Sequence, residues 1–223
     1  MSDCPRSVSA VVFDMDGLMF NTEEIYDQVG ATMLEKRGHR FTQELKRKMM
    51  GRQHLEALEV LRQHCELDES AQDLVAETEA LFIDLLPRRI EMMRGLAALL
   101  DMLEYRSIRK AVATSSSRRL AELALGHFNL VPRFEFVLTG DDVSRGKPDP
   151  EIYLTAAGRL GVSPESTVVL EDSINGTLAA TAAGMITIAI PSQPIQDGDF
   201  AHVKWVLEGL DSPMLESVIF GDA

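Results

Sequence analysis

Two carboxylates, Asp14 and Asp16, directly follow the apolar run Val11–Phe13, and Gly17 comes next. An apolar, β-branched run predicts a buried strand, and side chains two positions apart on a strand point the same way. The two acids can therefore share one site at the carboxyl end of that strand, where open α/β sheets bind ligands. Carboxylates held close together repel each other, and a divalent cation relieves the repulsion. Alone, the pattern would equally suit an acidic turn.

A hydroxyl and a second acidic pair follow two further predicted strands. Thr114 comes after Lys110–Ala113, and Glu171 with Asp172 comes after Thr167–Leu170. Because the carboxyl ends of parallel strands meet at one edge of a sheet, we expect these side chains to gather there. A cation held by acids from both pairs could bind a phosphoryl oxygen.

The chain is acidic, with 35 Asp and Glu against 22 Lys and Arg and a net charge of −13. An anionic substrate must therefore meet positive charge at one local point. Lys147 can supply it, because the prolines that follow restrict its loop and orient its amine toward a transferring phosphoryl group. The Thr114 hydroxyl and the N–H groups of Ser115 and Ser116, at the start of the next helix, can hold further phosphoryl oxygens.

The strands alternate with helical patterns, which favours an α/β fold: a Rossmann-like parallel sheet flanked by helices. Weaker strands are expected at Phe136–Leu138 and Met185–Ile190, and helices at Arg118–Phe128, Glu151–Leu160 and Asn175–Ala183. The strands are continuous apolar runs, which agrees with burial on both faces of the sheet.

Residues 21–94 contain no apolar strand-like run, and their leucines recur at helical spacing. We interpret this segment as an inserted α-helical cap domain above the strand ends. The expected division is a core of residues 1–19 and 94–223 and a cap of residues 20–93. The connections at Leu18–Asn21 and Met92–Gly95 are the expected hinges.

The motifs resemble the haloacid dehalogenase superfamily of phosphotransferases, in the subfamily that carries a helical cap after the first motif. Its four motifs stand here in order as Asp14-Met15-Asp16-Gly17, Thr114, Lys147 and Glu171-Asp172. The likeness covers essentially the whole chain apart from its C-terminal end.

The resemblance implies a Mg²⁺-dependent hydrolase of a small phosphorylated metabolite, such as a sugar or nucleoside monophosphate. Asp14 would attack phosphorus and form an aspartyl-phosphate. Asp16 would protonate the leaving oxygen and then take a proton from water. Mg²⁺ would bind Asp14, the backbone carbonyl of Asp16 and Asp172, with Glu171 or a water completing the shell.

The cap should select the substrate. Glu24 and Tyr26 are expected on the first cap helix near the mouth of the site, and Glu24 is a candidate substrate ligand. Arg52 could reach a substrate phosphate or hydroxyl, and a surface ion pair is an equal alternative.

Other activities remain open. β-Phosphoglucomutase resembles these phosphatases through the core, but it uses a cap histidine where this chain has Tyr26, and a cap lysine that Leu81–Leu86 does not offer. Both departures favour a phosphatase. A dehalogenase would leave Glu171 and Asp172 without a purpose. A non-catalytic binding or regulatory protein of this fold would be expected to lose a motif residue, and none is lost.

The composition argues against two classes of partner, nucleic acids and membranes. There is no basic stripe for nucleic acid and no apolar run of the roughly 20 residues that a membrane span needs. No signal peptide fits before the first strand, so we expect a cytoplasmic protein, as a monomer or weak dimer. The five histidines show no metal-ligand spacing, and each is expected to be exposed or hydrogen-bonded.

Overall fold

A computed structural model describes residues 8–49, 52 and 54–221, and a wholly parallel sheet lies at its centre. The six strands of the described residues run in the order β3-β2-β1-β4-β5-β6. Their bounds are β1 Ala10–Phe13, β2 Arg109–Ala113, β3 Val137–Leu138, β4 Thr167–Glu171, β5 Ile186–Ala189 and β6 Trp205–Val206. The first five match the predicted strands to within one residue at each end. The short β6 was not predicted, because two residues at a sheet edge leave no apolar run.

Helices cover both faces of the sheet, as predicted for a Rossmann-like α/β fold. Within the described part of the chain, the core helices are α5 Leu96–Tyr105, α6 Arg118–His127, α7 Glu151–Leu160, α8 Ile174–Ala182 and α9 Pro213–Phe220. Successive side chains of β1 point to opposite faces of the sheet, and each face is covered by its own layer of helices. Val11 and Phe13 pack with α5, α6 and α9, whereas Ala10 and Val12 pack with α7 and α8. This burial on both faces explains why the strands are apolar throughout.

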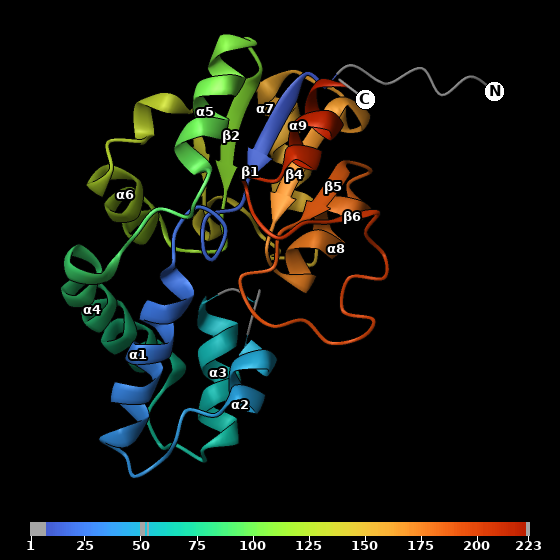
Figure 1. Ribbon diagram of the computed structural model, residues 1–223. Helices are drawn as coiled ribbons and strands as arrows, with labels where there is room; N and C mark the ends of the chain where they lie inside the picture. The colour runs from blue at the N-terminus through green and yellow to red at the C-terminus, as the bar shows by residue number, and fades with distance from the viewer. Residues whose placement is uncertain (1–7, 50–51, 53, 222–223) are drawn as a thin grey trace.

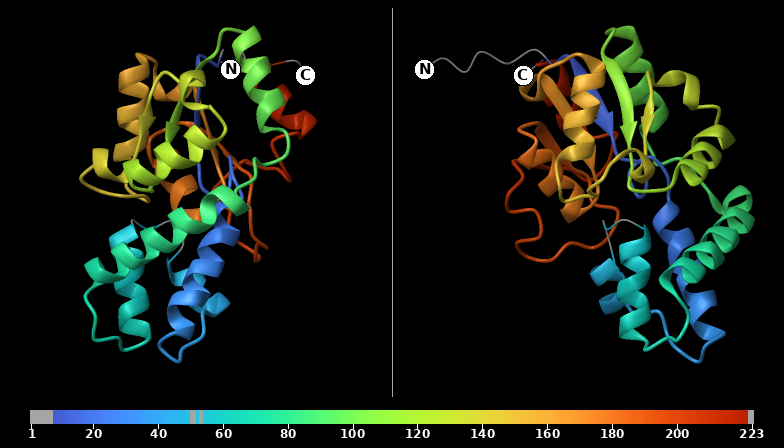
Figure 2. Two further views of the ribbon diagram at one scale, coloured as in Figure 1. Left: turned by 90° about the vertical axis from the view of Figure 1, so that its left-hand side faces the viewer. Right: turned by 180° about the vertical axis from the view of Figure 1, so that it is seen from behind.

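Further helices follow β1 and lie together beyond the carboxyl ends of the strands (Figure 1). They are α1 Thr22–Glu35, α2 Gln43–Met49, α3 His54–His64 and α4 Ala71–Arg89. They share a separate apolar core that includes Met33, Leu45, Leu61 and Leu74. Figure 2 shows the same separation from the side and from behind. We propose that these helices are a cap domain of residues 20–93.

The two connections between the helical cap and the sheet run side by side. Phe20 forms an antiparallel bridge with Met92. The Asn21 side chain joins both connections, because its Oδ1 accepts from Glu91 N at 2.8 Å and its Nδ2 donates to Arg89 O at 3.2 Å. Paired connections would move as one unit, and hinge motion at this place stays a prediction.

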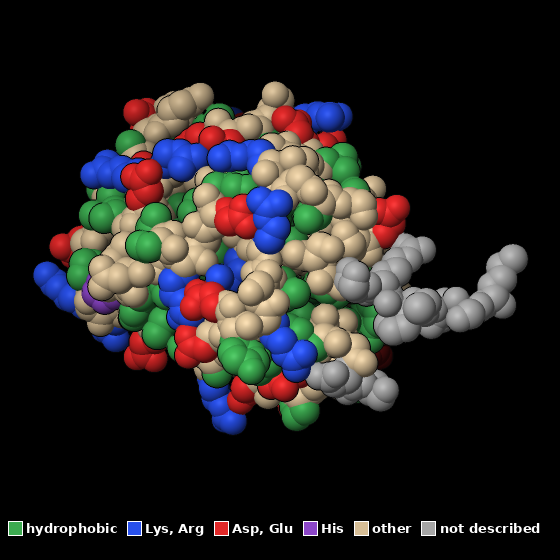
Figure 3. All heavy atoms as spheres, turned by 90° about the horizontal axis from the view of Figure 1, so that it is seen from above, with side chains coloured by type: hydrophobic (Ala, Val, Ile, Leu, Met, Phe, Trp, Pro, Cys, Tyr) green, Lys and Arg blue, Asp and Glu red, His purple; other side chains and the backbone are tan. Residues whose placement is uncertain are grey.

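The surface mixes charges. On the face seen in Figure 3, acidic and basic side chains are interspersed. No described helix combines the length and the apolar character needed to cross a membrane.

Candidate active site

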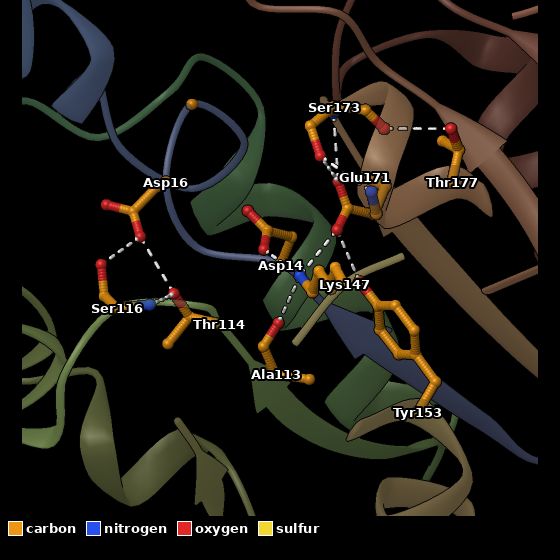
Figure 4. Close-up of polar contacts among 12 residues, drawn as sticks. Asp14, Asp16, Ala113, Thr114, Ser116, Lys147, Tyr153, Glu171, Ser173 and Thr177 are labelled. Carbon is orange, nitrogen blue, oxygen red and sulfur yellow. Dashed lines mark hydrogen bonds and ion pairs between the residues drawn. The ribbon is translucent and has the colours of Figure 1, made fainter. Parts of the chain in front are cut away.

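The acids, the hydroxyl and the lysine picked out from the sequence come together at the carboxyl edge of the sheet (Figure 4). The edge forms because β1 pairs with β2 on one side and with β4 on the other. Asp14 follows β1, Thr114 follows β2, and Glu171 ends β4 with Asp172 next to it. All four residues are buried, with exposed fractions of 6% or less. The predicted gathering of these residues is therefore observed.

Lys147 joins the acids at the ends of two strands, Asp14 after β1 and Glu171 at the end of β4. Its buried Nζ donates to Asp14 Oδ1 at 2.5 Å, to Glu171 Oε1 at 2.7 Å and to Ala113 O at 3.0 Å. These three bonds use all the protons of an ammonium group. Burial alone would lower the pKa of Lys147, but the charges of Asp14 and Glu171 hold that pKa well above its ordinary value. The lysine therefore stays charged and fixes the Asp14 carboxylate in place.

Glu171 is fully buried and both of its oxygens are occupied. Besides Lys147, the hydroxyl of Tyr153 donates to Oε1 at 2.7 Å. The backbone N and the Oγ of Ser173 donate to Oε2 at 3.1 and 3.0 Å. A carboxylate used in this way positions Lys147 and has little capacity left for a metal ion. The sequence did not reveal the role of Tyr153, which looks like an ordinary apolar position of α7.

Gly176 in α8 lies directly against the Glu171 carboxylate. A Cβ at position 176 would lie 1.7 Å from Glu171 Oε1. We expect Gly176→Ala to displace Glu171, to destabilise the fold by about 1–3 kcal/mol and to reduce activity. Gly158 in α7 is the matched control, because a Cβ there meets nothing within 4 Å. Gly158→Ala should raise the free energy of unfolding by about 0.5–1 kcal/mol. Denaturant unfolding of both variants checks this prediction, and two shifts of the same sign would contradict it.

Asp16 is turned away from Asp14 toward the segment after β2 (Figure 4). Its Oδ2 accepts from Thr114 Oγ1 at 2.9 Å and from Ser116 Oγ at 2.7 Å. Its Oδ1 is buried without a hydrogen-bond partner among the described residues. The Ser116 N–H, expected to hold a phosphoryl oxygen, donates to Thr114 Oγ1 at 3.0 Å instead. Thr114 and Ser116 thus hold one oxygen of Asp16 and leave the other free for chemistry.

Asp14, Glu171 and Asp172 can each offer one carboxylate oxygen to a common point, because these atoms lie within 4.8 Å of one another. Burial and the neighbouring carboxylates raise the pKa of Asp14 and of Asp172 well above the ordinary value. Close, buried oxygen ligands of one charge suit a hard divalent cation such as Mg²⁺. Since the Glu171 oxygens already accept hydrogen bonds, Asp14 and Asp172 fit direct ligation better.

The turn after β1 brings backbone close to Asp172. Gly17 has φ +79°, and a Cβ there would lie 2.1 Å from Asp172 Oδ2. Ser192, not singled out from the sequence, donates to the same oxygen at 2.5 Å. Glycine is therefore the residue that both the backbone angle and the space allow.

A cavity of about 160 Å³ extends from these acids into the cap. Ser115 and Ser116 line its core side. On the first cap helix Glu23 lines the cavity, whereas Glu24 is exposed and does not. Arg52 lines the cavity but is exposed, and its Nε donates to Lys48 O at 2.8 Å.

Two cap residues were missed by sequence reasoning. Lys46 is buried in the cavity wall, and its Nζ lies 3.2 Å from Glu23 Oε2 and 2.7 Å from Asp27 Oδ1. His54 also lines the cavity, and its buried Nε2 has no hydrogen-bond partner among the described residues. The expectation that each histidine is exposed or satisfied is therefore wrong for His54. No sequence signal identified either residue, because both face the cavity only through the packing of the cap helices.

A family model described as haloacid dehalogenase-like hydrolase matches residues 11–190. The chain belongs to this family. A phosphorylated carbohydrates phosphatase of Thermotoga maritima is 35% identical over 195 residues, covering 86% of this chain and 88% of that protein. A probable pseudouridine-5′-phosphatase of Drosophila melanogaster is 34% identical over 211 residues, covering 92% and 91%. This member of the haloacid dehalogenase-like hydrolases is accordingly an enzyme of the phosphatase type.

Solved structures of the family share the whole architecture. CbbY from Rhodobacter sphaeroides, in complex with phosphate, superposes with a TM-score of 0.82 at 28% identity, covering 91% of this chain and 95% of that one. A putative beta-phosphoglucomutase from Thermotoga maritima gives a TM-score of 0.73 at 29% identity, covering 95% and 96%. The likeness includes the helical cap as well as the sheet, because these alignments span nearly the full length of each chain.

Proposed function

We propose that this haloacid dehalogenase-like hydrolase is a Mg²⁺-dependent phosphatase of a small phosphorylated metabolite that works through an aspartyl-phosphate on Asp14. The observation that carries the proposal is the pair of aspartates after β1. Asp14 is held at 2.5 Å by a buried lysine, and Asp16 keeps one buried oxygen without a partner. One acid is thus fixed as a nucleophile, and its neighbour is available for proton transfer.

The chemistry follows from these positions. An Asp14 oxygen attacks phosphorus while the ester P–O bond breaks, and Asp16 in its acid form gives its proton to the leaving oxygen. Asp16 then takes a proton from the water that attacks the phosphorus of the aspartyl-phosphate, which releases phosphate and frees Asp14. Lys147 orients Asp14 throughout and offsets the charge of the incoming dianion.

A divalent cation would be held by Asp14 and Asp172, and when bound it would neutralise these acids and draw charge from the phosphoryl oxygens. We expect EDTA to abolish phosphate release and Mg²⁺ to restore it. Mg²⁺ at about 100 times its Kd should stabilise the fold by about 2.7 kcal/mol. Asp172→Asn should remove both effects, whereas Asn at the exposed Asp197 should keep them. Full activity in EDTA, or an unchanged Mg²⁺ shift in Asp172→Asn, would contradict this assignment.

The cavity lies between the acids of the sheet edge and the cap helices, which supports a leaving group small enough to fit beneath the cap. Curated relatives named for phosphorylated carbohydrates, pseudouridine 5′-phosphate and glycerol 3-phosphate support the same class. The direct test is phosphate release from a panel of sugar, polyol and nucleoside monophosphates with Mg²⁺. Release from at least one member is expected, and no release from any of them would contradict the proposal. The cytoplasmic location of the protein and its state as a monomer or weak dimer stay predictions.

A mutase is the second candidate, because a solved relative is described as a putative beta-phosphoglucomutase. The cavity argues against it. Among its described lining residues, the cap cations are Lys46, which is paired with two carboxylates, and the exposed Arg52. Burial raises the pKa of Tyr26, which stands where the mutase has its histidine, so this hydroxyl stays protonated. Conversion of β-glucose 1-phosphate to glucose 6-phosphate in the presence of the bisphosphate would favour the mutase instead.

A further inference from the structure

His54, the first residue of α3, has a ring nitrogen that no described residue contacts with a hydrogen bond. The side chain is 19% exposed, and it lines the same cavity as Asp14 and Asp16. Its Nε2 is buried without a hydrogen-bond partner among the described residues. A buried polar atom without a partner is costly, and in a cavity wall such an atom is available to a ligand.

The surroundings of the ring indicate which hydrogen bond Nε2 can make. Nδ1 lies 4.0 Å from Glu79 Oε1, and Glu79 is held in turn by Ser117 Oγ at 2.9 Å. Burial lowers the pKa of His54, so the ring is neutral near pH 7 and carries one proton. We assign that proton to Nδ1, because it faces a carboxylate. Nε2 is then an acceptor, and it requires an O–H or N–H donor.

A chain of contacts connects the ring to the acid–base residue. The ring of His54 stands edge-on to Tyr26 at 6.3 Å between centroids. The Tyr26 hydroxyl lies 3.3 Å from Ser116 Oγ, which donates to Asp16 at 2.7 Å. Asp16 and His54 therefore line the same cavity, joined by this chain of wall contacts, and a leaving group protonated by Asp16 shares that cavity with His54.

The charged groups of the cap wall favour a neutral leaving group. Lys46 is paired with both Glu23 and Asp27, and the other described cap cation of the wall, Arg52, is exposed. A second phosphate or a carboxylate on the substrate would therefore meet no buried, unpaired cation among the described cap residues of this wall. A hydroxyl, by contrast, can donate to the buried Nε2 of His54, which has no partner among the described residues.

We propose that His54 is a specificity-determining residue, whose Nε2 accepts a hydrogen bond from a hydroxyl of the leaving group. The enzyme therefore selects monophosphates of small, neutral, hydroxyl-bearing compounds such as polyols and sugars. This inference rests on the proposed phosphatase function.

The test compares substrates with and without hydroxyls. The hydroxylated probes are glycerol 3-phosphate, ribose 5-phosphate and glucose 6-phosphate, and the hydroxyl-free probes are propyl phosphate and phenyl phosphate. His54→Phe keeps a ring beside Tyr26 but removes both nitrogens. It should lower kcat/KM for the best hydroxylated probe about 10- to 100-fold and leave kcat/KM for the hydroxyl-free probes within about twofold. Equal losses on both sets would overturn the proposal.

Two amide substitutions at position 54 distinguish the roles of the two ring nitrogens. Gln places its amide near the depth of Nε2, and Asn places it near Nδ1. His54→Gln should keep most of the preference for hydroxylated probes, and His54→Asn should lose it. Rescue by Asn alone would assign the role to the Glu79 contact and overturn the proposal, and this comparison still decides if His54→Phe fails to fold. A wild-type enzyme inactive on all five probes would refute the phosphatase function itself.

Discussion

Asp14→Asn is expected to lower phosphate release by at least about 10⁴-fold, because an amide cannot form the aspartyl-phosphate. Lys147 holds one Asp14 oxygen at 2.5 Å, and the Asp14 side chain is only 9% exposed. The amide has nearly the same shape, so the loss should fall on kcat rather than on folding. Steady-state phosphate release from the best substrate of the panel measures it.

Two controls accompany this variant. Asp68→Asn makes the same chemical change at an exposed position of the cap and should keep full activity. Thermal unfolding of Asp14→Asn should stay cooperative and should not move to lower temperature, since burial already disfavours the Asp14 charge. Activity within tenfold of the wild type would show that Asp14 is not the nucleophile.

The second large effect is on stability. Lys147→Met is expected to cost about 3–5 kcal/mol of unfolding free energy, because it leaves buried carboxylates without their counter-charge. Lys147 makes hydrogen bonds to Asp14 at 2.5 Å and to Glu171 at 2.7 Å, and all three side chains are buried. Activity should be lost as well, since Asp14 is no longer held or shielded. Denaturant unfolding at neutral pH, without added metal, gives the free energy.

Lowering the pH should reduce the loss of unfolding free energy caused by Lys147→Met. The pKa of Asp14 is raised by burial even with Lys147 present, and removing the lysine charge raises it further. A carboxyl whose folded-state pKa lies above its unfolded value favours folding below the unfolded value, and this contribution is lost as pH rises through the folded-state pKa. The difference between Lys147→Met and the wild type should therefore shrink as pH falls from neutral.

A double variant separates charge from position. Adding Glu171→Gln to Lys147→Met removes one uncompensated carboxylate and should recover part of the lost stability without restoring activity. Gly158→Ala, on the exposed face of α7, can be combined with each variant as a control, because its effect on stability should simply add to theirs. A Lys147→Met variant as stable as the wild type would contradict the structural role given to the lysine.

Much of the core could be predicted because parallel strands impose simple rules. The run Val11–Phe13 is buried on both faces of the sheet, so it had to be apolar throughout. Asp14 and Thr114 follow neighbouring strands and Glu171 ends a third, so adjacency in the sheet brings their side chains together without further information.

The cap could be predicted only as a group of helices. On a helix one residue corresponds to a rotation of about 100°, so a small error in phase exchanges Glu24 for Glu23. The correct phase depends on which side of α1 packs against α4, and tertiary contacts decide that. Lys46 and His54 reach the cavity for the same reason.

Contacts between residues that are distant in the sequence could not be predicted either. Tyr153 and Ser192 act on Glu171 and Asp172 through single hydrogen bonds of 2.7 and 2.5 Å. Nothing in the local pattern around either residue distinguishes it from an ordinary core or loop position.

The most direct test of the mechanism uses Asp16→Asn with p-nitrophenyl phosphate, whose leaving group needs no proton. Without Asp16, attack by Asp14 can proceed, but water is no longer activated to hydrolyse the aspartyl-phosphate. We expect a burst of p-nitrophenol close to one equivalent per enzyme, followed by slow turnover, with a phosphoryl group found by mass spectrometry on the acid-quenched peptide that contains Asp14. Turnover without a burst, and with no phosphoryl group on that peptide, would contradict covalent catalysis by Asp14.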